Sequence, residues 1–167
     1  IFHCLLIIND MQNCIGPLTS IALYADDTKI WRTINNYSDH IVLQRDIIKL
    51  HKWYIANKMT FHPNKCKVLS VSHLYEESIL PFDRYPYCLD NVCLDYVNSQ
   101  KDLGVFMNCR LNWTEQCNAL ISKANTMLNL VRRTCHFTKC KNQKRVLYLT
   151  LVRSQFEHCS VIWRPHT

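Results

Sequence analysis

Glycine is scarce in this sequence, where only 2 of the 167 residues, Gly16 and Gly104, are glycine. Phosphate-binding loops and dinucleotide-binding fingerprints need several glycines at fixed spacing, so the sequence excludes both. Long apolar runs are also missing, because no stretch approaches the roughly 20 apolar residues that a membrane span needs. A disordered tail is excluded as well, because 48% of the residues are hydrophobic and can form a core.

The 10 cysteines fall just below the share that marks a disulfide scaffold. The start of the chain does not have the pattern of a secretory signal. We therefore expect reduced thiols, no membrane association and an intracellular protein, nuclear or cytoplasmic. Because the sequence begins with Ile1 and not with Met, we interpret it as an internal piece of a longer protein.

Positive charge is concentrated in the last part of the chain. Residues 1–100 hold nine Lys and Arg against ten Asp and Glu, whereas residues 101–167 hold eleven against three, a balance of +8. Such asymmetry is typical of a mixed-charge part joined to a basic part that meets a polyanion. A solvated helical surface rich in Lys and Arg is the alternative.

The hydrophobic pattern predicts an α+β part followed by a helical part. Apolar β-formers on both sides of Asp26 and Asp27 predict two strands hinged on this acidic pair. Ser38 is expected to cap a helix that runs to about Asn57. A strand over 67–72, a loop over 73–84 and short strands over 85–107 follow, with Gly104 in the last strand.

Two helices are expected in the last third of the chain. Thr114 is the predicted N-cap of the first, and a second helix is expected over about 142–156. The first helix carries an apolar stripe at helical spacing, formed by Cys117, Leu120, Ile121, Ala124, Leu128 and Val131.

The adjacent carboxylates of Asp26 and Asp27 allow two interpretations. In a solvent-exposed turn they would carry no chemistry, since Asp is a common turn residue. Alternatively, a tight hairpin could present them to divalent cations, which prefer carboxylate oxygens and substrate phosphates. Two such metals can activate an attacking hydroxyl and stabilise a leaving phosphate oxygen.

The segment around the acidic pair resembles a known motif. Leu23-Tyr24-Ala25-Asp26-Asp27-Thr28 is similar to the Tyr-Ala-Asp-Asp box of reverse transcriptases. Four further segments resemble, in the same order, those of non-LTR retrotransposon enzymes of the jockey-like group. They are Leu5 to Met11, Trp53 to Val68 with its Asn-Lys-Cys-Lys-Val end, Lys101-Asp102-Leu103-Gly104-Val105, and Leu147 to Pro165 with its Trp-x-Pro end.

This resemblance implies a fold and a set of roles. Residues 1–112 would be the C-terminal part of the polymerase palm, and residues 113–167 the helical thumb. Asp26 would bind catalytic Mg²⁺ or Mn²⁺, Asp27 would assist, and Tyr24 would lie near the incoming nucleotide or primer end. Lys65 matches the lysine often proposed as general acid, although Lys67 lies close enough that the sequence does not choose between them.

The implied activity is RNA-directed DNA synthesis, with an RNA template, a DNA primer and deoxynucleoside triphosphates as partners. Two-metal chemistry needs another Asp, which the family carries upstream of the Tyr-Ala-Asp-Asp box. We therefore expect these residues alone to be inactive. The alternative is a non-catalytic, nucleic-acid-binding remnant of a decayed retroelement.

Basic side chains of the last part of the chain are the expected nucleic-acid contacts, since Lys and Arg bind phosphates without regard to sequence. They are Lys101, Lys123, Arg132, Arg133, Lys144 and Arg145. Cysteine and histidine pairs offer a third possibility, a zinc site, against the simpler view that these thiols are scattered. The pairs are Cys135-His136 with Cys140, His158-Cys159, and Cys88 with Cys93.

Overall fold

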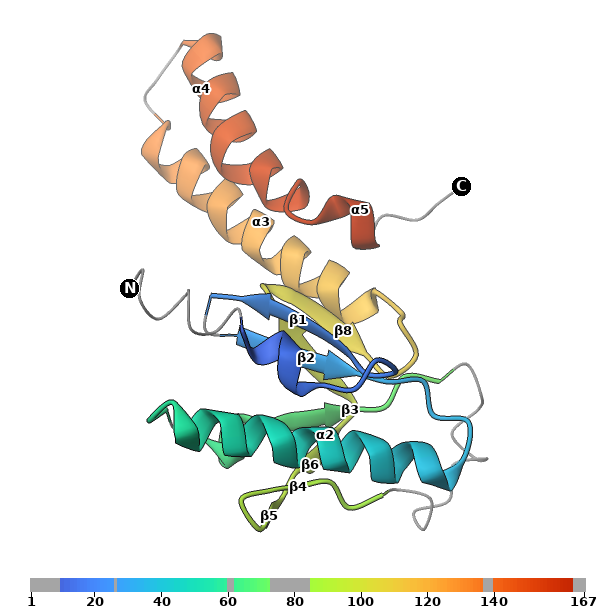
Figure 1. Ribbon diagram of the computed structural model, residues 1–167. Helices are drawn as coiled ribbons and strands as arrows, with labels where there is room; N and C mark the ends of the chain where they lie inside the picture. Colours follow the sequence, from blue (N-terminus) through green and yellow to red (C-terminus); the bar gives the residue numbers. More distant parts are fainter. Residues whose placement is uncertain (1–9, 26, 60–61, 73–84, 137–139, 164–167) are drawn as a thin grey trace. The chain divides into compact units, whose positions relative to one another are not determined.

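The computed structural model describes residues 10–25, 27–59, 62–72, 85–136 and 140–163 (Figure 1). Within them the chain has a mixed α+β fold, as predicted, and its strands form four two-stranded sheets. The chain divides into two compact units, residues 1–68 with 74–96, and residues 69–73 with 97–167. Among the described residues, no helix has both the length and the apolar character needed to cross a membrane.

The first unit is built on a hairpin and a long helix. Its elements are η1 (Asp10–Cys14), β1 (Ser20–Tyr24), β2 (Asp27–Trp31), α2 (Tyr37–Ala56), η2 (Pro63–Lys65), β3 (Lys67–Leu69), β4 (Cys88–Leu89), β5 (Val92–Cys93) and β6 (Asp95–Val97). β1 pairs with β2, β3 with β6, and β4 with β5. The predicted loop over 73–84 lies outside the described residues.

Two small hydrophobic clusters hold α2 in the first unit. Met11, Leu50 and Tyr54 form one cluster, against which the inward side chains of the β1–β2 hairpin pack. The other cluster contains Ile47 of α2 together with the buried Tyr87 and Leu89 of the β4 segment. Helix α2 therefore contacts two hairpins through apolar residues spaced three and four positions apart, Ile47, Leu50 and Tyr54.

The N-terminus of α2 differs from the prediction in its capping residue. Asn36, not Ser38, is the N-cap, and its side chain accepts a hydrogen bond from the backbone N–H of Asp39. The Asp39 carboxylate in turn accepts one from the N–H of Asn36, which completes a capping box. Ser38 lies inside the helix and donates its hydroxyl to the Asn36 side chain.

The second unit combines a hairpin with a helical arm, which consists of the helical segments 114–134 and 141–156. Its elements are β7 (Ser99–Asp102), β8 (Val105–Asn108), α3 (Thr114–Thr134), α4 (Lys141–Leu147), η5 (Tyr148–Val152), η6 (Arg153–Phe156) and α5 (Ser160–Trp163). Gly104 lies in the β7–β8 turn with φ of 89°, not inside a strand as expected. This backbone conformation favours glycine, which explains the residue at this position.

The helical arm agrees with the prediction in its extent but not in its details. Thr114 is the first helical residue, and the N-cap is Trp113, whose side chain makes no capping hydrogen bond. The second helix changes from α in α4 to a π turn in η5 and a 3₁₀ turn in η6. Of the predicted stripe, Ile121 is 50% exposed, so it lies outside the face that packs.

The core of the arm is small. It is formed by Ala124, Val131 and Cys135 of the α3 segment together with Val152 of η5. Figure 1 shows α3 and the α4–η5 segment running side by side. Such a pair of helices presents most of its surface to solvent, which leaves room for many charged side chains.

Candidate functional site

The β1–β2 hairpin carries the acidic motif. Tyr24 pairs with Asp27 at its end, so the register leaves only residues 25 and 26 between the strands. Ala25 has φ of 52°, in the left-handed region that two-residue hairpin loops require. The predicted pair of strands is thereby confirmed, but Asp27 is part of β2 and not of the connection between the strands.

Strict alternation along both strands explains which side chains the hairpin presents. Every second residue packs inward, beginning with Ile21 and Thr28, and the residues between them are exposed. Tyr24 and Asp27 both belong to the exposed face, and Tyr24 is 65% exposed. The aromatic ring and the carboxylate of the motif are therefore both accessible from solvent at the end of the hairpin.

A buried carboxylate fixes the segment that enters β1. Asp46 of α2 is 1% exposed and accepts hydrogen bonds from the Thr19 hydroxyl at 2.7 Å and the Gly16 N–H at 3.4 Å. Lys49, one turn further along α2, donates to the same carboxylate at 2.9 Å. Burial alone would raise the pKa of Asp46, but the Thr19 and Lys49 hydrogen bonds and the Lys49 charge outweigh it and lower the pKa. The ionised side chain thus joins the start of β1 to α2.

The metal-ligating set expected from the resemblance is only partly within the described residues. Asp26 lies outside them, and Asp27 is the one member whose position is given, as the first residue of β2. Its exposed carboxylate is the hard oxygen donor that Mg²⁺ and Mn²⁺ prefer. Within the described residues, three or more metal-ligating side chains do not come together at any point. Since Asp26 is not included, this finding does not bear on the acidic pair.

Lys65 and Lys67 have different surroundings. Lys65 is the last residue of η2 and is exposed, whereas Lys67 begins β3. The Lys67 ammonium lies 2.7 Å from the Asp95 carboxylate. The two lysines that the sequence could not separate therefore differ in backbone structure and in ion pairing, since Lys65 belongs to a 3₁₀ turn and Lys67 to a strand.

The predicted nucleic-acid contacts all belong to the second unit. Lys101 lies in β7 with its ammonium 5.4 Å from the centre of the Phe106 ring. The other five lie on the two helices of the arm and are all exposed: Lys123, Arg132 and Arg133 on α3, and Lys144 and Arg145 on α4. The arm therefore presents cationic side chains on both of its helices.

Two glutamines that bond the backbone of a strand, Gln116 (buried) and Gln44 (half-buried), were not anticipated from the sequence. Gln116 of α3 is 2% exposed and accepts a hydrogen bond at 2.9 Å from the N–H of Phe106 in β8. Gln44 of α2 bonds both the N–H and the C=O of Cys88 in β4. Each glutamine thus satisfies the backbone of a hairpin strand that its own helix covers. A polar residue within the apolar stripe of a helix was the available signal.

The candidate zinc-binding pairs differ in their contacts: the sulfur atoms of Cys88 and Cys93 lie 3.1 Å apart, and the Cys159 sulfur lies 3.5 Å from His158 Nε2. Cys135 is buried in the arm core, while Cys140 is exposed. The His158 imidazole lies against the carbonyl of Leu103, with Nε2 at 3.3 Å.

Comparisons of the chain with protein families, with curated proteins and with solved structures give no match.

Proposed function

We propose that this chain is the palm end and thumb of a reverse transcriptase from a non-LTR, jockey-like retrotransposon. The parent enzyme adds deoxynucleotides to a DNA 3′ end on an RNA template. One observation supports the proposal most strongly. The motif residues Tyr24 and Asp27 pair at the end of a tight hairpin, with their side chains on its exposed face.

Asp26 and Asp27 are the proposed ligands of Mg²⁺ or Mn²⁺. The exposed Asp27 carboxylate fits such a role, because a hard cation needs oxygen ligands and open positions for substrate phosphates. When bound, the metal ions supply activation of the attacking hydroxyl and stabilisation of the leaving oxygen. Tyr24, opposite Asp27, offers a ring on which a sugar or base can pack.

Lys65 is the proposed general acid for the pyrophosphate leaving group. Its ammonium is exposed, and among the described residues it has no ion-pair partner. Lys67 is a poorer candidate, because a proton given up by Lys67 would leave the Asp95 carboxylate unneutralised. The difference in surroundings therefore favours Lys65 for proton transfer.

The helical arm is the proposed thumb. Exposed lysines and arginines on α3 and α4 suit contacts with the phosphates of a template–primer duplex, which recognise backbone and shape more than bases. Such contacts position the duplex and carry no sequence information.

A non-catalytic, nucleic-acid-binding remnant is the second candidate. The basic surface of the arm favours it, because phosphate binding by these side chains needs neither Asp26 nor a metal ion. Both candidate functions include nucleic-acid binding. They differ in whether the β1–β2 hairpin takes part in catalysing nucleotide addition.

Primer extension separates the two candidates. The chain extended upstream to include the remaining palm should extend a DNA primer on an RNA template only when Mg²⁺ or Mn²⁺ is present. The Asp26→Asn variant should bind the duplex as well as the parent but lose extension. Duplex binding without extension by the parent would instead favour the remnant.

A further inference from the structure

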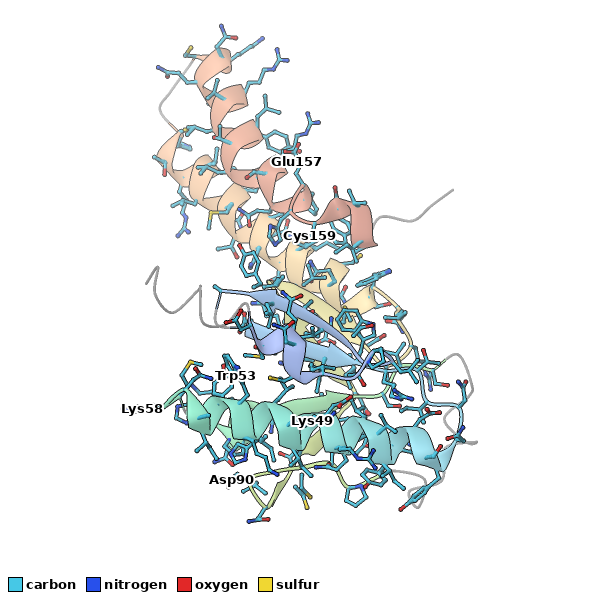
Figure 2. All side chains as sticks on the ribbon, in the orientation of Figure 1. Lys49, Trp53, Lys58, Asp90, Glu157 and Cys159 are labelled. Atoms are coloured by element: carbon cyan, nitrogen blue, oxygen red, sulfur yellow. The ribbon has the colours of Figure 1, made fainter. Side chains whose placement is uncertain are left out.

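The β4–β5 hairpin places two cysteines directly opposite each other. Cys88 pairs with Cys93, and Leu89 pairs with Val92 next to the turn. The turn residues Asp90 and Asn91 have φ of 52° and 60°, the combination that a two-residue type I′ turn requires. Figure 2 shows Asp90 at the tip of this hairpin.

The register makes the cysteine pair a non-hydrogen-bonded pair. The N–H of Leu94 donates to the carbonyl of Tyr87 at 2.8 Å, so the hydrogen-bonded positions lie on either side of the cysteines. Non-hydrogen-bonded partners have the shorter Cα separation, about 4.5 Å, which lies within the range that a disulfide spans. The backbone therefore already has a spacing that permits a cross-strand disulfide.

The two thiols are close and accessible. The sulfur atoms of Cys88 and Cys93 lie 3.1 Å apart. Cys93 is exposed and Cys88 is half-buried, so a small reagent in solution can reach the pair. The Cys88 sulfur also contacts the Pro86 carbonyl at 3.5 Å.

The surrounding structure holds Cys88 in this position. Tyr87 and Leu89, its neighbours in the chain, are both buried in the cluster around Ile47. The Gln44 side chain bonds the N–H and the C=O of Cys88 at 2.9 and 2.8 Å. Because the backbone is anchored at three successive residues, Cys88 stays opposite its partner across the strands.

We propose that Cys88 and Cys93 form a redox-responsive dithiol, which closes to an intramolecular disulfide by exchange with a small-molecule disulfide such as glutathione disulfide. The Cys93 thiolate attacks one sulfur of glutathione disulfide and releases a glutathione thiolate. The Cys88 thiolate then attacks the Cys93 sulfur and releases the second. The protein loses two electrons and two protons, and one glutathione disulfide becomes two glutathione molecules.

The order of these steps follows from exposure and from the hydrogen bond between the thiols. Cys93 is the more exposed sulfur and meets the reagent first. The hydrogen bond to Cys93, followed by burial, raises the pKa of Cys88. Cys88 therefore keeps its proton longer, and closure should become faster as pH rises, since the thiolate is the attacking form.

Peptide mapping tests the proposal without ambiguity about the other cysteines. Trypsin cleaves after Arg84 and Lys101 and releases residues 85–101, which contain Cys88 and Cys93 and no other cysteine. The folded protein is equilibrated with glutathione buffers, and its free thiols are then blocked with iodoacetamide. The masses of the tryptic peptides are measured by mass spectrometry. The expected peptide is unblocked and about 2 Da lighter than its reduced form, since disulfide formation removes two hydrogens.

Two comparisons show whether the fold favours closure. The measured quantity is the concentration of glutathione disulfide divided by the square of the glutathione concentration, at the point where half of the protein molecules hold the Cys88–Cys93 disulfide. It is determined for the folded chain and for the chain unfolded in urea. The unfolded chain should need a value at least about tenfold higher. In Cys88→Ser, Cys93 should instead retain bound glutathione. A folded wild-type peptide that stays doubly blocked, or that carries glutathione without closing, would overturn the proposal. Equal closure in folded and unfolded chains would overturn it as well.

Discussion

Replacing Asp46 by Ala is expected to destabilise the first unit, because this one substitution removes three hydrogen bonds. The carboxylate is 1% exposed and accepts three hydrogen bonds, from Thr19, Gly16 and Lys49. Hydrogen bonds to charged groups contribute about 1.5–3 kcal/mol, and an orphaned buried hydroxyl costs about 1–3 kcal/mol. Thr19 is 7% exposed, so its hydroxyl would lose its acceptor without gaining full access to water. We therefore expect a loss of about 3 kcal/mol in unfolding free energy.

The assay is urea unfolding followed by tryptophan fluorescence in a Trp113→Phe, Trp163→Phe background. The remaining Trp31 and Trp53 both belong to the first unit, and Trp53 packs against its core. With a slope of about 2 kcal/mol per molar urea, the midpoint should fall by about 1.5 M.

Lys49→Met is the matched control for this experiment. Lys49→Met removes one bond to the carboxylate but leaves those of Thr19 and Gly16 in place, so it should cost about 1.5 kcal/mol, less than Asp46→Ala. If Asp46→Ala costs no more than Lys49→Met, then the buried carboxylate does not anchor the start of β1 and the reasoning is refuted. Thr19→Val combined with Asp46→Ala should cost less than the sum of the single changes, because the orphaned hydroxyl is gone.

Three further predictions follow from named contacts. Because the pKa of Asp46 is lowered in the folded protein, its ionised form stabilises the fold above the unfolded pKa of about 3.9, and this stabilisation is lost as pH falls through the folded pKa. The difference in unfolding free energy between the parent and Asp46→Asn should therefore shrink between about pH 5 and pH 2, and a constant difference would contradict this. Gly104→Ala should destabilise the second unit by about 1–2 kcal/mol in thermal unfolding, because φ is 89° and the added methyl lies 3.2 Å from the His158 ring; unchanged stability would count against the turn geometry. Changing Arg132 and Arg133 to Gln should reduce by about 2 the slope of log binding constant against log salt for an RNA–DNA duplex, whereas an unchanged slope would remove both from the interface.

The hairpin and the long helix could be predicted because their signals are local. Alternation of apolar and exposed residues around the acidic pair fixes which side chains face inward, and the structure follows it residue by residue. The cap of α2 was missed because Asn36 and Ser38 are both good cap residues. The reciprocal bond between Asn36 and Asp39 decides between them.

The contacts between elements could not be predicted from local patterns. Gln44 and Gln116 each bond a backbone group of a hairpin, and a helical pattern can mark such a polar residue but cannot identify its partner. Ile121 has the spacing of a core residue, but the small arm core does not reach it. The pairing of Lys67 with Asp95 likewise depends on tertiary structure.

Primer extension tests the proposed polymerase role most directly. The chain extended upstream is compared with two variants that each lack one carboxylate, Asp26→Asn and Asp95→Asn. Asp95→Asn is the matched control, because this carboxylate is exposed and, within the part of the chain that the structure describes, pairs only with Lys67. Asp26→Asn should lower the extension rate more than about 100-fold, since even outer-shell metal contacts contribute 10–100-fold. Asp95→Asn should leave the rate within about twofold, as expected for an exposed ion pair. Equal rates for Asp26→Asn and the parent would contradict the account.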